Sequence, residues 1–271
     1  MYKKLFLPII CLLVFGIFCG CFEKSGNAEI AVNTEIPRNV DVFDMIPDNY
    51  IGFAYVNKNI LKEEENPFLK NLGVDVEDTN YIISAYSESS AIIIVDGNFN
   101  LKNFKEFLNE KGYEKDSYKG VEIYKTKSPL GKSSVAVIGN KIVFGLNEGV
   151  ENCIDTIVGN KKSILNMKDI AEIKDMVSGG DMYSIARANK ENKYNATCFG
   201  VGIKYLDNNT VYYKIITKYK NENSAKIGYE NALKNIEIEK EDGFYDINAK
   251  RDGLFVIMES KINKDNLTKL T

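Results

Sequence analysis

The side chains that most proteins use for nucleophilic and metal chemistry are scarce in this chain. Its 271 residues include no histidine and only five cysteines. The absence of histidine excludes His-based catalytic triads, imidazole metal ligands and histidine pH switches. Neither Ser-x-x-Lys nor Gly-x-Ser-x-Gly occurs, so the common routes of nucleophilic hydrolysis have no support. The composition predicts a protein that is not an enzyme and that holds no cofactor and no metal.

Carboxylates are the remaining groups that could catalyse a hydrolysis. Acidic runs occur at residues 63–65 and at Glu237, Glu239 and Glu241. Glycoside hydrolysis needs two carboxyl groups facing each other across a cleft, one of them with a raised pKa. Such runs are more typical of a solvated surface, so a carboxylate-dependent surface hydrolase is kept only as an alternative function.

The sequence before Cys21 carries a recognisable targeting pattern. A basic start at Lys3 and Lys4 and an apolar run precede a Gly-Cys pair at Gly20-Cys21. This order is typical of an export signal over residues 1–20 with a lipid attached to Cys21. An uncleaved membrane helix is the second interpretation, because the run approaches the length that spans a bilayer. Simple cleavage and release is the third.

The other cysteines and three sequons define the remaining candidate sites. Cys153 and Cys198 would form one disulfide outside the cytoplasm, or remain two buried thiols that behave as small apolar side chains. Asn195, Asn208 and Asn266 each begin an Asn-x-Thr sequence and are candidate N-glycosylation sites in an exported protein. Asn208 is the best placed, in an expected exposed turn.

Charge and composition restrict the partners. The formal net charge is −3, and it becomes more negative when a signal carrying Lys3 and Lys4 is removed. A nucleic-acid-binding surface needs clustered basic charge, so nucleic acid is not expected as a partner. The polar segment 21–39 lacks a hydrophobic period and is expected to be a flexible tether. The expected partners are the membrane, through the N-terminal anchor, and an unidentified protein or small molecule.

Hydrophobic periodicity gives the elements that must position these residues. Strands are expected near 50–56, 81–87, 91–96, 121–126, 133–138, 141–146, 182–188, 197–206, 210–219, 243–249 and 253–260. Helices are expected over 58–71, 100–111, 147–158, 164–177 and 223–236. Gly139-Asn140 and Asp252-Gly253 are dipeptides typical of tight hairpins.

This order predicts an α+β fold made of two related antiparallel β-sheet units with helices packed on one face. The first unit would cover residues 40–180, the second 181–262, and 263–271 would be a tail. The relation between the units rests on Asp48-Asn49-Tyr50 and Asp181-Met182-Tyr183, each of which opens a strand that ends in Asn-Lys. A chance similarity between two α+β units is the alternative.

Three segments carry a resemblance to known proteins. They read IPDNYIGFAYVN, YKGVEIYK and VAVIGNKIVFGLNEGVENCIDTIVGN. Over residues 46–178 the chain resembles a group of uncharacterised archaeal and bacterial envelope lipoproteins that carry only a domain-of-unknown-function label. The resemblance implies structural motifs and no active site. Heavy use of Lys, Ile and Asn suits a methanogen-like archaeon.

The function expected from these observations is that of a lipoprotein at the outer face of the cell membrane. It would be lipid-anchored, or held by an uncleaved N-terminal helix, and would act as a binding or structural module. A small-ligand carrier with its pocket between the two units is a further alternative.

Overall fold

The computed structural model describes residues 40–61, 67–128, 131–189, 192 and 194–267. The expected signal, Cys21, the tether and the acidic run at 63–65 lie outside these residues. Helices are η2 (Val42–Met45), α2 (Lys58–Leu61), α3 (Pro67–Asn71), α4 (Leu101–Glu110), α5 (Gly149–Ile157), η3 (Ile164–Asn166), α6 (Lys168–Val177), α7 (Glu222–Glu241) and α8 (Lys264–Leu267).

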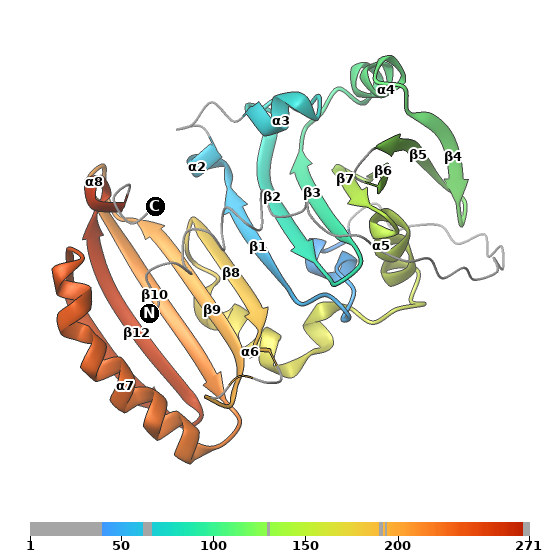
Figure 1. The fold of residues 1–271 in the computed structure, drawn as a ribbon. Coiled ribbons are helices and arrows are strands. Elements are labelled where there is room, and N and C mark those ends of the chain that lie inside the picture. The colour runs from blue at the N-terminus through green and yellow to red at the C-terminus, as the bar shows by residue number, and fades with distance from the viewer. Residues whose placement is uncertain (1–39, 62–66, 129–130, 190–191, 193, 268–271) are drawn as a thin grey trace. The chain divides into compact units, whose positions relative to one another are not determined.

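The strands belong to one twelve-stranded sheet in the order β11-β12-β10-β9-β8-β1-β2-β3-β7-β6-β5-β4 (Figure 1). The first seven along the chain are β1 (Gly52–Asn57), β2 (Thr79–Tyr86), β3 (Ala91–Gly97), β4 (Glu114–Tyr118), β5 (Val121–Ser128), β6 (Gly131–Ile138) and β7 (Lys141–Leu146). The others are β8 (Met182–Arg187), β9 (Ala196–Tyr205), β10 (Thr210–Tyr219), β11 (Phe244–Asp252) and β12 (Phe255–Asn263).

The expected pair of related sheets is therefore wrong. One large, largely antiparallel sheet replaces them, and its two ends differ in the number of strands. Strands β1–β7 run β1-β2-β3-β7-β6-β5-β4, whereas β8–β12 run β8-β9-β10-β12-β11. The order of the second series, three successive strands followed by the last and the next-to-last strand, also occurs in the first five positions of the first series, where β5 and β4 are additional, so the duplication stays a prediction.

Contacts divide the described chain after Asn166 into two compact units. We call residues 40–166 the N-terminal unit and residues 167–267 the C-terminal unit, and α6 belongs to the second of these. Each unit is described by itself below.

The core of the N-terminal unit lies on both sides of β3, every residue of which is buried. On one side, Phe104 and Leu108 of α4 pack over Phe144, with the Phe104 and Phe144 rings edge to face at 6.1 Å. On the other side α5 lies close to the sheet, because a Cβ on Gly149 would come 2.4 Å from the Ala91 carbonyl oxygen. Helices therefore cover two faces here, and the expected single covered face is wrong.

The C-terminal unit also has a helix on each face. Helix α6 packs on β9 at Gly200, where an added Cβ would meet Ile173 at 2.2 Å. Helix α7 lies against the opposite face alongside β12, and its Ala225 and Tyr229 pack with Tyr219 (Figure 1). Side chains of β10 point to the two faces in turn, because the Lys218 side chain contacts α6 while Tyr219 packs on α7.

Most elements that carry a hydrophobic period are confirmed by the structure. Strands β7 and β10 have the expected bounds, and the hairpins at Gly139-Asn140 and Asp252-Gly253 join β6 to β7 and β11 to β12. Strand β4 was missed. Its sequence, EKDSY, has no apolar residue except the terminal tyrosine, and the strand lies at the edge of the sheet, where burial does not select hydrophobic side chains.

Candidate functional site

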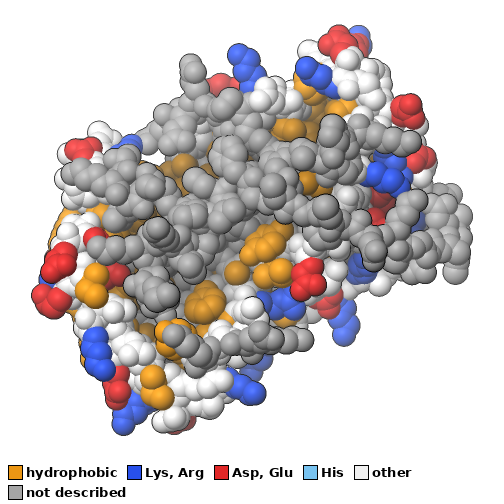
Figure 2. Space-filling view, viewed as in Figure 1, with side chains coloured by type: hydrophobic (Ala, Val, Ile, Leu, Met, Phe, Trp, Pro, Cys, Tyr) orange, Lys and Arg blue, Asp and Glu red, His pale blue; other side chains and the backbone are white. Residues whose placement is uncertain are grey.

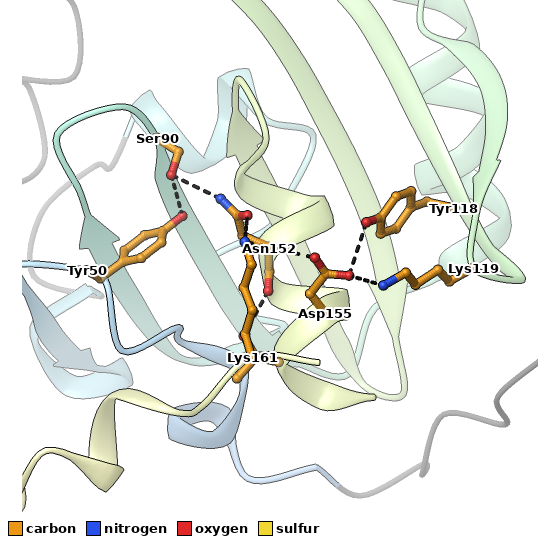
Figure 3. A network of polar contacts seen from close by, with 8 residues as sticks. Tyr50, Ser90, Tyr118, Lys119, Asn152, Asp155 and Lys161 are labelled. Atoms are coloured by element: carbon orange, nitrogen blue, oxygen red, sulfur yellow. Dashed lines mark hydrogen bonds and ion pairs between the residues drawn. The ribbon is translucent and has the colours of Figure 1, made fainter. Parts of the chain in front are cut away.

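A chain of polar contacts crosses α5 in the N-terminal unit (Figure 3). At its centre, Asp155 Oδ1 accepts hydrogen bonds from Lys119 Nζ at 2.5 Å and from the Tyr118 hydroxyl at 3.0 Å. Lys161 Nζ lies 3.9 Å from Asp155 Oδ2. The side chains of Lys119 and Asp155 are each 15% exposed, so this pair is largely removed from water.

The same contacts continue into the core. Lys161 donates to Asn152 Oδ1, and Asn152 Nδ2 donates to Ser90 Oγ at 3.3 Å. Ser90 Oγ donates in turn to the Tyr50 hydroxyl at 3.0 Å. Burial raises the pKa of Tyr50 above its usual value, so this phenol stays neutral. We call the connected residues Tyr50, Ser90, Tyr118, Lys119, Asn152, Asp155 and Lys161 the α5 network.

A tight turn delivers two members of the α5 network. Lys119 and Gly120 both have positive φ, at 49° and 80°, in the turn that joins β4 to β5. Two consecutive positive φ values match the twist of a two-residue hairpin. The turn brings Tyr118 and Lys119 to Asp155 on α5 (Figure 3). Sequence reasoning missed this pairing, although the Lys-Gly dipeptide was a usable signal of the turn.

The α5 network joins the three segments that carry the sequence resemblance. IPDNYIGFAYVN contributes Tyr50, YKGVEIYK contributes Tyr118 and Lys119, and the third segment contributes Asn152 and Asp155. The segments are far apart along the chain and meet at one helix. Their common feature is therefore a set of contacts that fixes α5 on the sheet.

A second charged cluster lies at the end of β3. Asp96 Oδ2 is 3.2 Å from Lys141 Nζ and accepts a hydrogen bond from Asn140 Nδ2 at 2.7 Å. Asp96 Oδ1 accepts from Asn80 Nδ2 at 2.9 Å. Burial, with the Asp96 charge nearby, raises the pKa of Tyr81. The carboxylate of this buried pair is saturated with donors, as a buried charge requires.

The C-terminal unit has a third charged cluster, between α6 and β10. Lys218 Nζ lies 2.6 Å from Asp169 Oδ1 and contacts Glu172. The same ammonium group lies 5.5 Å from the centre of the Phe255 ring. Two carboxylates on one helix thus hold one lysine of the sheet, which fixes α6 on β10.

The electrostatics of the carboxyl groups disfavour acid catalysis. Hydrogen bonds from Lys105, Lys115 and Tyr124 lower the pKa of Glu122 to about 2. The hydrogen bond from the Ser117 backbone nitrogen, together with Lys125, lowers the pKa of Asp116. At Asp169, burial is outweighed by hydrogen bonds from Lys218 and Thr197 and by nearby lysine charges, which lower the pKa. The pKa of Asp207 is lowered as well, by hydrogen bonds from the backbone nitrogens of Asn209 and Thr210. Such groups are ionised at neutral pH and are poor proton donors.

The buried polar atoms of these clusters are used within the fold. Within the described ranges, no buried side-chain nitrogen or oxygen lacks a hydrogen-bond partner. In that same part of the chain, no three Cys, Asp or Glu side chains gather in a way that could hold a metal ion. The α5 network and the Lys218 cluster can therefore fix helices on the sheet, and the Asp96 cluster can fix neighbouring strands.

The chain is similar to two proteins of Methanocaldococcus jannaschii. The uncharacterized protein MJ0635 is 28% identical over 284 residues, and the match covers 96% of each chain. The uncharacterized protein MJ1281 is 26% identical over 274 residues, which cover 96% of this chain but only 25% of that longer protein. No protein-family model matches the chain. These names attach no activity to the shared sequence.

The structure places the two downstream cysteines in different units. Cys153 lies in α5 and Cys198 in β9, and both are buried, free thiols in the structure. The disulfide that the sequence left open is thus not formed there. Burial raises the pKa of Cys198 to about 12 and that of Cys153 further, which keeps both thiols in their unreactive protonated form.

The three sequons lie in different surroundings. Asn195 is exposed just before β9, Asn208 is exposed in the turn between β9 and β10, and Asn266 is half-buried in α8. Glu237, Glu239 and Glu241 lie at the end of α7, and Glu237 pairs with Lys240 at 2.8 Å. This acidic run therefore has the character of a solvated helix face.

A partly open apolar surface lies on the α7 side of the C-terminal unit. Val201, Ile215 and Met258 are half-buried neighbours across β9, β10 and β12, and Phe199, two residues before Val201, is 41% exposed. We call these four residues the open face. Figure 2 shows hydrophobic side chains at the surface over the strands of this unit.

The described residues contain no helix that is both long and apolar enough to cross a bilayer. The apolar run before Cys21 lies outside the described residues. The anchor therefore stays a prediction from the sequence.

Proposed function

We propose that this chain is a binding module held at the outer face of the cell membrane, through a lipid on Cys21 or through an uncleaved N-terminal helix. The order of basic residues, apolar run and Gly20-Cys21 supports the anchor. The open face supports the binding role. The open face consists of four neighbouring apolar side chains on the sheet, and covering them with a partner lowers the free energy.

The charged clusters favour binding over hydrolysis. A hydrolase that uses carboxylates alone needs one carboxyl that stays protonated near neutral pH. Glu122 and Asp169 have lowered pKa values, because each is held by lysine side chains. A carboxylate-dependent hydrolase would need a protonated carboxyl group as its acid, whereas Glu122 and Asp169 are ionised members of ion pairs.

Attachment can be tested with Cys21→Ser in the full-length chain. The wild-type protein should remain in the membrane fraction and carry a lipid mass at Cys21. Cys21→Ser should lose that mass, while Cys153→Ser serves as the matched control and should keep it. Wild-type protein that is membrane-bound but unmodified at Cys21 would support the uncleaved helix, and release of the wild-type protein would contradict both anchors.

Binding can be tested by placing a photo-crosslinking residue at Phe199 of the membrane-anchored protein. Lys250 is a matched control, because it is exposed in the same unit on the face that carries α6. A discrete adduct at 199 and not at 250 is expected. Its mass separates a protein partner from a small ligand, which would favour the carrier alternative. Equal labelling at both positions would contradict a binding role for the open face.

A further inference from the structure

The structure separates the three Asn-x-Thr sequons by how accessible their amide groups are. Asn208 is exposed, and its neighbours Leu206, Asp207 and Asn209 are exposed as well. Within the part of the chain that the structure describes, the Asn208 side chain makes no hydrogen bond or ion pair. Its amide nitrogen is therefore free and has open space around it.

The turn that carries Asn208 is held by other residues. Asp207 Oδ1 accepts hydrogen bonds from the backbone nitrogens of Asn209 at 2.8 Å and Thr210 at 2.7 Å. The Asn209 carbonyl oxygen accepts a further hydrogen bond from the Lys264 nitrogen at 2.8 Å. A group attached to Asn208 would project from a fixed hairpin end without displacing any of these contacts.

The other two sequons are less suited to modification. Asn195 has φ of 52° and donates from Nδ2 to Ser224 Oγ at 3.3 Å, at the start of α7. The Asn266 amide packs over Gly243, since a Cβ added to that glycine would come 2.8 Å from Asn266 Nδ2. A bulky substituent at either amide nitrogen would press on a neighbouring element.

We propose that Asn208 is an N-glycosylation site and that Asn195 and Asn266 stay unmodified. The proposal rests on the outer-face location proposed above. The donor would be a saccharide linked to a lipid phosphate. The bond between the sugar C1 and the phosphate oxygen breaks, a bond from C1 to Asn208 Nδ2 forms, Nδ2 releases one proton, and the lipid phosphate leaves. Thr210 supplies the hydroxyl that completes the sequon.

The test is mass spectrometry of the full-length protein purified from its source organism, with glycopeptide mapping. A saccharide mass is expected on the peptide that contains Asn208. Asn208→Gln and Thr210→Ala should lose this mass completely, whereas Thr210→Ser should keep it, because serine retains the hydroxyl. Asn195→Gln and Asn266→Gln are matched controls that should leave the mass unchanged.

Two results would overturn the proposal: an unmodified Asn208 in the wild-type protein, or a saccharide on Asn195 or Asn266. Protease treatment of intact cells, read on the same samples, reports the location separately. A protease-accessible protein with a bare Asn208 contradicts the glycan alone. A protease-protected protein with a bare Asn208 contradicts the outer-face location as well.

Discussion

Lys119 Nζ and Asp155 Oδ1 lie 2.5 Å apart, although the residues are separated by 36 positions in the chain. The pair connects the β4–β5 turn to α5. Removal of Asp155 would leave the Lys119 charge largely buried without a partner. Leaving one buried charge without its partner lowers the free energy of unfolding strongly. Replacing both charged residues with apolar ones changes it much less.

We therefore expect Asp155→Ala to lower the free energy of unfolding by about 3 kcal/mol, as for other buried pairs that lose one partner. The double variant Lys119→Met/Asp155→Leu should be more stable than Asp155→Ala, because it removes both charges. Urea denaturation measures both. Lys102→Ala is the matched control, because Lys102 pairs with Glu106 at an exposed site, and its effect should stay within about 0.5 kcal/mol. A small loss in Asp155→Ala would contradict the assignment.

Glu122 should make stability depend on acid pH. Its pKa is lowered from 4.5 to about 2 by Lys105, Lys115 and Tyr124. A carboxyl with a lowered folded-state pKa contributes stability that is complete above its unfolded-state pKa and is lost as the pH falls through its folded-state pKa. The contribution should therefore disappear between about pH 5 and about pH 2. In Glu122→Gln the free energy of unfolding should fall less steeply over this range.

Denaturation curves at several pH values measure that slope. Glu106→Gln, at an exposed site, controls for the loss of one negative charge. Equal slopes in Glu122→Gln and the wild-type protein would show that Glu122 is not held as the structure has it.

Gly200 should tolerate no side chain, because a Cβ there would come 2.2 Å from Ile173 Cγ2 of α6. Gly200→Ala should lower the free energy of unfolding by about 1–3 kcal/mol, as overpacking of a core does. Gly179→Ala is the matched control, since nothing lies within 4 Å of its added Cβ. Ile173→Ala should lower the free energy of unfolding less in the Gly200→Ala background than in the wild-type protein. Additive effects of the two substitutions would argue against this contact.

The thiols of Cys153 and Cys198 should be unreactive in the folded protein, because both are buried and their pKa values are raised. A thiol reagent followed by peptide mapping should label neither residue under native conditions. Both should be labelled after denaturation without reductant. Failure to label either residue after denaturation would show a disulfide, contrary to the structure.

The sequence was sufficient to predict elements whose side chains have a hydrophobic period. The strand expected near 210–219 is β10, and the helix expected over 223–236 lies within α7. Strand β4 was not predictable in this way, because its pairing with β5 comes from backbone hydrogen bonds and its side chains are exposed. The α5 network was missed for a related reason, since contacts between distant polar residues leave no period in the sequence.

The sequence by itself determined which residue types are available for chemistry, with no histidine and few cysteines, and it predicts an export-type start that ends at Cys21. These follow from residue type and local order. Only the tertiary structure decided that one sheet replaces two, that helices cover two faces in each unit, and that Asp155, Lys119 and Tyr50 belong to one set of contacts. Strand order and polar pairing depend on which segments meet in space, and this depends on packing the whole chain rather than on any local pattern.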